Sequence, residues 1–497
     1  MKKRFFCLTA LLLCLLLCFV SCNNNEVDST QGQNETNTPT PDTEPPVVSK
    51  SLDYTLSDDG SYYIVTGIGT YDDYNLIIPE EHEGKPVKDI EAGAFYDCLD
   101  IITVTIPDTI TVITNNVFTD CRNLVTVTIG KNVTEIKEYA FRNCHKLVEV
   151  INNSPSVTIT NDETNGSVGL NALSISNAEE SYTTKISFEE NGYILYTNGD
   201  AKYLMGSVGN CQRIVVDNGI NGIFKYAFPD NGEVVWLEVN SSLDFIGEYA
   251  FNGCYNLLSV VLREDVLEIG EKAFQYCRKL YEAVSMKSTY IERGTETGYL
   301  GTAVNIYNSG MEYISKLSCT DDGFVFVDLK IYSYIGDEAE ITLPQKTEYI
   351  GDYAFSKNSK IKKVTFNGNL DSVGDCAFED CIALENVVFW KSSINDPGIN
   401  RWGMRNIGIK AFSGCTALKE ICLPKEVNYI SKDAFLGCNE LKIFCLKGTP
   451  GNDFQTGWHG NGEVYYYSFE EPQWEMHEYR NYWHYADDEK VIWERPE

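Results

Sequence analysis

Residues 246–257 read Ile-Gly-Glu-Tyr-Ala-Phe-Asn-Gly-Cys-Tyr-Asn-Leu, and the same spacing of Ile, Ala-Phe, Cys and Leu recurs along the chain. We number positions from the phenylalanine, taken as zero. Ala or Val precedes this residue in every copy, and in eight copies Cys follows at +3. Most intervals are 23 residues, and a fixed period of this kind is the signature of a repeat architecture. The ten copies are Phe95, Phe118, Phe141, Phe228, Phe251, Phe274, Phe355, Phe378, Phe412 and Phe435.

Apolar residues also recur within each repeat, at −5, +6, +9 and +11. The spacing of two between +9 and +11 predicts a strand whose +9 and +11 side chains point inward and whose +8 and +10 side chains point outward. The Ala-Phe-x-x-Cys segment predicts one short helical turn. A coil this small cannot bury its own apolar side, so neighbouring coils must stack. The fold class that we predict is a β-rich solenoid of 23-residue coils, each with one short strand and one short helical turn, with hairpin insertions.

A longer period overlies the short one. Turn sequences at 58–60, 190–192 and 321–323 recur at nearly equal intervals, and each ends in Asp-Gly or Asn-Gly, which favour two-residue hairpin turns. Trp474, Trp483 and Trp493 indicate a distinct aromatic segment that closes the last repeat. We therefore expect three modules stacked into one continuous body and followed by a strand-rich C-terminal cap: module 1 (51–182), module 2 (183–313), module 3 (314–450) and the cap (451–497).

The string at 246–257 resembles the treponemal class of leucine-rich repeat, the unit of BspA-like bacterial surface proteins. The tail, with Val464 to Ser468, Asn481 to Tyr485 and Trp493, is similar to closing segments of that family. The resemblance covers roughly residues 51–497. It implies a leucine-rich-repeat binding protein or adhesin that recognises host or bacterial surface macromolecules, such as matrix or plasma proteins, epithelial surfaces or other bacteria. The family has no shared catalytic motif, so the resemblance implies no catalytic residue.

The first 22 residues have the pattern of an export signal. Three basic residues precede the uncharged apolar run 5–20, which ends at Val-Ser-Cys22. This ending resembles a bacterial lipobox, although Phe19 stands where such boxes usually have Leu. It predicts lipidation of Cys22 and anchoring at the bacterial cell surface or outer envelope; a plain signal peptide with an incidental Cys22 is the alternative. Residues 23–50 are polar and rich in Asn, Thr and Pro, which predicts a disordered tether.

The net charge and the absence of known catalytic motifs exclude several classes of function. With 40 Lys and Arg against 72 Asp and Glu, the formal net charge is −32, which disfavours nucleic acid and anionic lipid as partners. None of the five His lies in a His-Glu-x-x-His pair, and no nucleophile elbow, P-loop or dinucleotide fingerprint occurs. Residues 161–166 resemble a calcium loop faintly, but Ala172 stands at the position of its bidentate Glu. We therefore expect no enzyme activity, no cofactor and no metal.

Cysteine usage favours buried thiols over disulfides. Four of the 17 cysteines lie in the leader, which leaves an odd number after it, and eight of those occupy the +3 position. Such residues behave as small apolar side chains. We expect free thiols at Cys98, Cys121 and Cys144. Cys422 and Cys445, both at +10, are expected to approach each other on the outward side of adjacent coils.

Two regions are candidates for binding. The first is the outward strand face of module 1, where threonine is also what any solvated sheet face would favour. The second is an insertion at 390–404, because the interval from Phe378 to Phe412 exceeds the usual period and the extra chain must leave the coil. Trp and Arg are enriched in binding hot spots, although Trp402 could instead pack onto the solenoid. The candidate residues are Thr103, Thr105, Thr126 and Thr128 on the face, and Trp402, Arg401 and Arg405 in the insertion. A structural envelope protein without a specific ligand is the alternative function.

Overall fold

The computed structural model describes residues 51–178, 182–209, 211–310, 313–389, 404–448, 453–472, 480–486 and 489–494. All of them lie in the second of two compact units into which the chain divides, residues 1–49 and 50–497. Cys22, Arg401 and Trp402 lie outside the described residues. No helix in the described part of the chain is long and apolar enough to cross a membrane.

The strand at +8 to +11 forms as predicted and pairs in parallel with its copy in the next coil. In the first array this ladder includes β6 (Thr103–Thr105), β8 (Thr126–Ile129) and β10 (Glu149–Asn152). Val104, Val127 and Val150 lie side by side at +9, and all three are buried. A second short strand ends at −5, with two residues in coils such as that of β7 (Val112–Ile113) and four in β18 (Leu243–Ile246) and β20 (Val266–Ile269). The β-solenoid fold is therefore confirmed, with two strands in a coil where we expected one.

The predicted helical turn is wrong in detail, because the Ala-Phe-x-x-Cys segment is a tighter turn. In the coil of Phe251, both Tyr249 (φ 55°) and Gly253 (φ 75°) have left-handed backbone, and the same positions, −2 and +2, are left-handed in every one of the ten phenylalanine coils. A left-handed residue ends a right-handed helix. Every second N–H then points along the solenoid: that of Phe251 donates to the carbonyl of Ala273 at 2.7 Å, and that of Gly253 to Gln275 at 2.8 Å.

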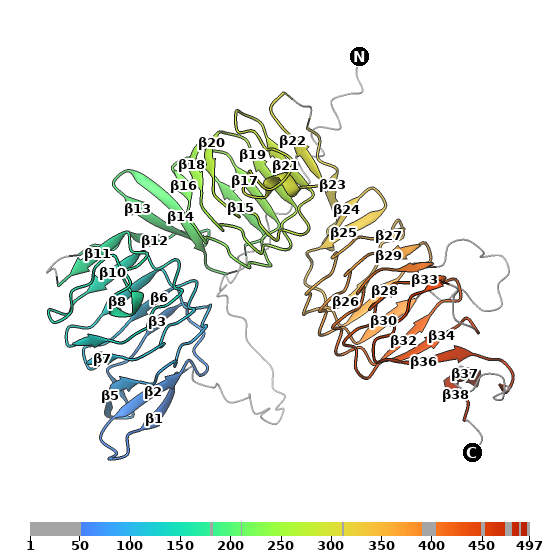
Figure 1. Cartoon of the computed structure of the whole chain (residues 1–497), viewed down its shortest axis with the longest axis horizontal. Coiled ribbons are helices and arrows are strands. Elements are labelled where there is room, and N and C mark those ends of the chain that lie inside the picture. Colours follow the sequence, from blue (N-terminus) through green and yellow to red (C-terminus); the bar gives the residue numbers. More distant parts are fainter. Residues whose placement is uncertain are drawn as a thin grey trace, which may run out of the picture. The chain divides into compact units, whose positions relative to one another are not determined.

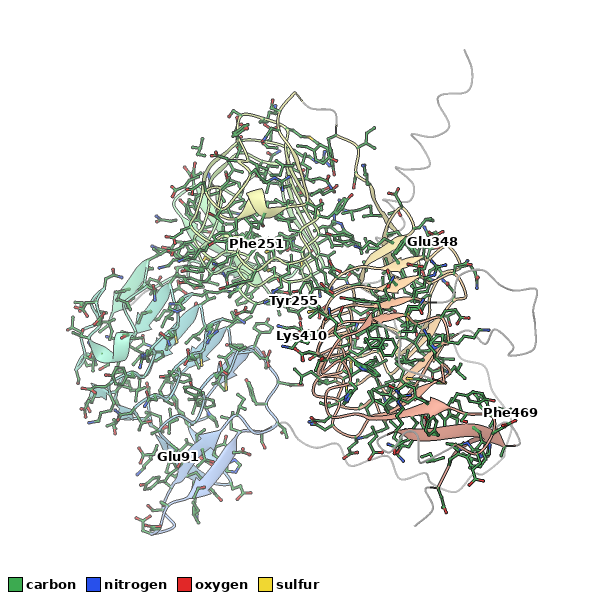
Figure 2. The ribbon with its side chains drawn as sticks, turned by 45° about the vertical axis from the view of Figure 1, so that its right-hand side comes forward. Glu91, Phe251, Tyr255, Glu348, Lys410 and Phe469 are labelled. Atoms are coloured by element: carbon green, nitrogen blue, oxygen red, sulfur yellow. The ribbon has the colours of Figure 1, made fainter. Side chains whose placement is uncertain are left out.

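Phenylalanine and cysteine form two columns through the core. The rings of Phe228, Phe251 and Phe274 stack with centroids 5.2 Å apart, and Phe251 is completely buried inside the second array (Figure 2). The thiol of Cys254 donates to the carbonyl of Phe228, in the preceding coil, at 3.0 Å. Cys121, Cys144, Cys277, Cys381, Cys415 and Cys438 make the same contact with the phenylalanine of the coil before them. The thiols therefore satisfy backbone carbonyls within the stack.

The expected approach of Cys422 and Cys445 is wrong. Leu423 pairs with Cys445, and Cys422 pairs with Phe444. The last coil is one residue shorter between these strands, so Glu420 pairs with Lys442 where the usual period would bring it to Ile443. A slip of one residue turns a side chain to the other face, and Cys445 is accordingly inward and buried.

The strands divide into three arrays, each beginning with a hairpin that is followed by stacked coils (Figure 1). The second and third arrays have two sheets each, and the first has three, because β7 and β9 (Glu135–Ile136) pair apart from the sheet of the hairpin. The first array comprises β1 (Asp53–Leu56), β2 (Tyr63–Gly67), β3 (Asn75–Ile77), β4 (Glu81–His82), β5 (Lys85–Ile90), β6, β7, β8, β9 (Glu135–Ile136), β10 and β11 (Ser174–Asn177), with the 3₁₀ turn η1 (Asn165–Ser167). The second array comprises β12 (Ile186–Phe188), β13 (Tyr193–Asn198), β14 (Ala201–Ser207), β15 (Arg213–Val216), β16 (Gly222–Ile223), β17 (Trp236–Val239), β18 (Leu243–Ile246), β19 (Ser259–Leu262), β20 (Val266–Ile269), β21 (Glu282–Ser285) and β22 (Asn305–Tyr307), with η2 (Leu300–Thr302).

The third array has two sheets of eight strands. One comprises β23 (Leu317–Cys319), β24 (Phe324–Val327), β25 (Lys330–Tyr334), β27 (Tyr349–Ile350), β29 (Ser372–Val373), β31 (Asn406–Ile407), β33 (Tyr429–Ile430) and β35 (Asp453–Phe454). The other comprises β26 (Glu340–Thr342), β28 (Lys363–Phe366), β30 (Asn386–Phe389), β32 (Glu420–Leu423), β34 (Lys442–Cys445), β36 (Glu463–Tyr467), β37 (Asn481–Ala486) and β38 (Glu489–Ile492). The described part of 451–497 thus extends both sheets, and Trp483 is fully buried against Phe444.

The sheets do not continue from one array to the next in the described residues, which differs from the continuous stack that we expected. An apolar seam at position +7 meets the next array instead. Ile102, Val125 and Val148 pack against side chains of the second array that include Ile194 and Met205. Val235 and Leu258 of the second array pack in the same way against Val325 of the third. In the third array the side chains at +7 are charged and exposed: Lys362, Glu385 and Lys419.

Candidate functional site

The outward strand face of the first array is less open than we predicted. Thr103, Thr105 and Thr128 are half-buried, and Thr126 is buried. Thr103 and Thr126 lie side by side, as do Thr105 and Thr128, so the four do form one patch. The patch is closed at its C-terminal end, where Thr126 donates a hydrogen bond to Glu149 at 3.2 Å.

Glu149, which we expected to be outward and solvated at +8, is completely buried because the segment after β11 crosses over it. Its carboxylate accepts hydrogen bonds from the Tyr182 hydroxyl at 2.9 Å, the Thr184 hydroxyl at 2.7 Å and the Lys185 N–H at 2.7 Å. Burial raises the pKa of Tyr182 to about 12. The carboxylate therefore ties the first array to the segment that begins the second.

The same arrangement recurs at the end of the second array. Glu282 is buried and accepts hydrogen bonds from Ser259 and Tyr313, both at 2.9 Å, and from Ser315 at 3.0 Å. Glu149 and Glu282 occupy the same position of the last phenylalanine coil in their arrays. We call the contact between the first and second arrays the first joint, and that between the second and third arrays the second joint.

A buried lysine completes each joint. Lys146 donates to the amide oxygen of Asn123 at 2.9 Å and to the backbone carbonyl of Ala227, in the next array, at 2.6 Å. Lys279 likewise contacts Asn256 at 2.6 Å and the carbonyl of Ala354 at 3.2 Å. Burial lowers the pKa of each lysine to about 7. We did not predict these residues, although the repetition of lysine at +5 in both arrays is visible in the sequence.

Of the candidate residues in the insertion, only Arg405 is described. Its Nε lies 3.7 Å from a carboxylate oxygen of Asp371, and its side chain is half exposed. The Arg405 N–H also donates to the carbonyl of Asp371 at 2.7 Å, so its backbone continues the ladder between coils. The contacts of Arg405 therefore do not test whether the insertion binds anything.

The described side chains offer no constellation for metal chemistry. In this part of the chain, no three His, Cys, Asp or Glu side chains come together in a way that could hold a metal ion. Apart from the partly exposed Cys98, the +3 cysteines are buried among the coils, and burial raises the pKa of Cys381 to about 12 and that of Cys121 further. Such thiols are inert, because the thiolate is the reactive form.

Stacked coils with a phenylalanine column and parallel strands define a leucine-rich-repeat solenoid. The model of the BspA type leucine rich repeat region matches six copies in this chain, over residues 81–193, 202–295 and 328–449. The chain belongs to this family. No curated protein matches it.

Several solved structures are similar to this chain. A leucine rich cell surface protein from Faecalibacterium prausnitzii is 20% identical, with 87% of this chain and 97% of that chain covered and a TM-score of 0.30. A leucine-rich repeat protein from Bacteroides ovatus is 15% identical, covering 89% and 100%, with a TM-score of 0.23. The pneumococcal vaccine antigen PcpA is 15% identical, covering 85% and 95%, with a TM-score of 0.27. These scores lie below 0.5, so the family assignment rests on the repeat match.

Proposed function

We propose that this protein is displayed on the bacterial surface and binds host or microbial macromolecules through outward strand faces of its solenoid, without catalysis. The observation that supports this most is the regular parallel pairing of outward positions, as in Thr103 with Thr126 and Thr105 with Thr128. Paired strands lie about 4.8 Å apart, so such positions form an extended lattice suited to recognition by area.

The third array offers the more open lattice. Glu340 and Thr342 of β26 are exposed, as are Asn386 and Val388 of β30. In the pairing, Lys363 of β28 lies between the negatively charged Glu340 and the neutral Asn386, so the face presents groups of different charge and can discriminate between partners by complementary contacts. This face and the threonine patch are the two surfaces that we assign to macromolecular binding.

The binding role is tested by immobilising matrix proteins, plasma proteins, mucin and a glycan array and measuring capture of the purified protein. We expect at least one surface to capture it, and capture to fall when Thr105 and Thr128 become Glu or when Lys363 becomes Glu. Thr111→Glu, at an exposed position on a different side of the coil, is the matched control. Equal capture by all variants would contradict binding through the strand faces, and no capture at all would favour a structural envelope protein.

We also propose that lipid on Cys22 holds the protein at the cell surface or outer envelope. The lipobox-like ending of the leader supports this. Cys22→Ser should move the protein from the detergent phase into the medium or periplasm, because the substitution removes the acyl chains whose burial in the bilayer would hold the protein there. Detergent-phase partitioning that survives this substitution would contradict the anchor.

The insertion at 390–404 is a third proposed contact region, through Trp402, Arg401 and Arg405. Its support is its length and its Trp and Arg content on an acidic chain. Shortening the interval between Phe378 and Phe412 to the usual period should reduce capture while leaving thermal stability in place. A stably folded deletion with unchanged capture would leave binding to the strand faces alone.

A further inference from the structure

We propose that the first joint contains a binding site for a neutral saccharide. A pocket of about 310 Å³ opens there between the first and second arrays. Asp120, Arg122, Asn143 and His145 of the first array and Tyr226 and Asp230 of the second line it. Pockets of this size at the boundary between two folded parts are typical ligand sites. The site is separate from the strand faces and stands whether or not they bind a partner.

The second joint shows that a joint needs no such pocket. The two joints are built from equivalent positions, but different residues occupy them. Arg122 and Asp230 lie 3.9 Å apart in the first joint, and their counterparts, Tyr255 and Lys357, pack with the ammonium 4.9 Å from the ring centroid. Figure 2 marks Tyr255 beside the third array, and the hollow at that joint is only about 80 Å³. In the second joint, Tyr255 and Lys357 therefore occupy the space that stays open between Arg122 and Asp230 in the first joint.

Contacts among the lining side chains fix the walls of the first pocket. His145 stacks on Tyr226 with centroids 4.6 Å apart, and Tyr226 stacks on Tyr249 at 5.0 Å, so the three rings form one column. The Asn143 amide donates to Asp120 at 3.0 Å. A site held by such contacts loses little conformational freedom when a ligand enters, which favours affinity.

The polar groups fit hydroxyls better than ions. Arg122 lies 3.7 Å from Asp120 and 3.9 Å from Asp230, both longer than the roughly 2.7–2.9 Å of a charge-assisted hydrogen bond. The guanidinium therefore balances the carboxylates yet keeps donors for a ligand. Burial lowers the pKa of His145, so the imidazole is neutral near pH 7. Two carboxylates repel an anion and the adjacent guanidinium repels a cation, whereas a sugar hydroxyl both donates and accepts.

The test is calorimetric titration of the purified protein with the methyl glycosides of glucose, galactose, mannose and N-acetylglucosamine at up to about 10 mM. We expect at least one to bind. The double variant Arg122→Tyr with Asp230→Lys copies the second joint into the first; it should abolish binding while shifting the melting temperature by less than about 2 °C. Asn143→Ala should raise the Kd about tenfold, the effect of one lost hydrogen bond. Lys357→Ala, in the second joint, is the matched control and should leave the Kd unchanged.

Three outcomes would overturn the proposal. One is that none of the four glycosides binds. Another is that the filled variant, or a variant with only Asn143→Ala if the double variant fails to fold, binds as the wild type does. The third is that an anionic probe, glucose 6-phosphate or N-acetylneuraminic acid, binds more tightly than every neutral glycoside.

Discussion

The ammonium of Lys146 lies 2.6 Å from the backbone carbonyl of Ala227, 81 residues further along the chain. Within an array, the carbonyl before a phenylalanine accepts the N–H of the phenylalanine in the preceding coil, as Ala250 does from Phe228 at 2.7 Å. Ala227 belongs to the first phenylalanine coil of its array, and the lysine of the previous array supplies the donor. A buried lysine thus links two arrays by satisfying a backbone acceptor.

The buried lysines make the stability of the joints depend on pH. Lys146 has a pKa of about 7 when buried, against an ordinary value of 10.5, so the unfolded chain binds more protons between these values. Stability therefore rises with pH between about 7 and 10.5, and it is lost as pH falls across this range towards the folded pKa. We expect the wild type to gain on the order of 1.5 kcal/mol per lysine between pH 7 and pH 8.5 relative to Lys146→Met or Lys279→Met. Denaturant melts at both pH values measure this difference, and parallel pH profiles for all three proteins would contradict it.

Glu149 should be one of the most sensitive polar positions. Glu149→Ala leaves the Tyr182 and Thr184 hydroxyls and the Lys185 N–H without their acceptor, which should cost about 3 kcal/mol and release the segment between the arrays. Denaturant unfolding measures the cost, and hydrogen exchange of the Lys185 amide measures the release. Glu135→Ala, at an exposed carboxylate, is the control and should change stability by less than about 0.5 kcal/mol. Equal effects of the two variants would refute the role of Glu149.

Phenylalanines at the middle and the end of a column should differ when removed. Phe251 stacks between Phe228 and Phe274, so Phe251→Ala should cost about 3–5 kcal/mol through lost burial and the cavity left behind. Phe435 stacks on Phe412 and meets the edge of Trp458 instead of another phenylalanine, and its removal should unfold mainly the last coils. Hydrogen exchange along the chain distinguishes the two results. Global unfolding of equal size from both would argue against a one-dimensional stack.

The thiols should fall into two classes of reactivity. Cys319 is exposed, whereas Cys121, Cys144 and Cys254 are buried, and burial raises the pKa of each buried thiol. Brief treatment of the native protein with iodoacetamide should label Cys319 and spare the other three, which should react only after denaturation. Peptide mass spectrometry measures the alkylation of each cysteine. Alkylation of Cys144 at the rate of Cys319, or a native disulfide at any of the three, would contradict the thiol column.

Most of the fold could be predicted from the periodicity of the sequence. The inward positions +9 and +11 and the columns at zero and +3 follow from hydrophobic spacing, since each buries the same side chains in every coil. The prediction of a helical turn was wrong because the Ala-Phe-x-x-Cys spacing buries one face of the segment whether or not the backbone is helical. The left-handed residues at −2 include Tyr249, Lys272 and Cys376. These residue types do not predict a left-handed backbone in a sequence.

The joints could not be predicted in the same way. Position +8 is outward in a plain coil, so Glu149 was expected to be solvated, and only the chain that crosses it makes it a buried acceptor. Spacing also gives no sign of which side chains at +7 meet another array. The recurrence of Lys146 as Lys279 and of Glu149 as Glu282, both by the same shift along the chain, was the readable signal, because a repeated polar residue in a core position suggests a repeated partner.

The apolar seam at +7 determines how such a chain can change in length. Each of the first two arrays carries its own seam, its buried lysine and its buried glutamate. Each of the last two carries the hairpin that packs on the seam and the alanine carbonyl that accepts from the lysine. A duplication or loss of the gene segment for one whole array would therefore reproduce a complete joint at each new boundary. Recombination at a point inside an array would separate the apolar +7 side chains from the array that covers them and would leave them exposed to water. The solenoid is thus expected to evolve by whole arrays, and the charged side chains at +7 in the third array do not form the apolar seam that a joint of this kind uses.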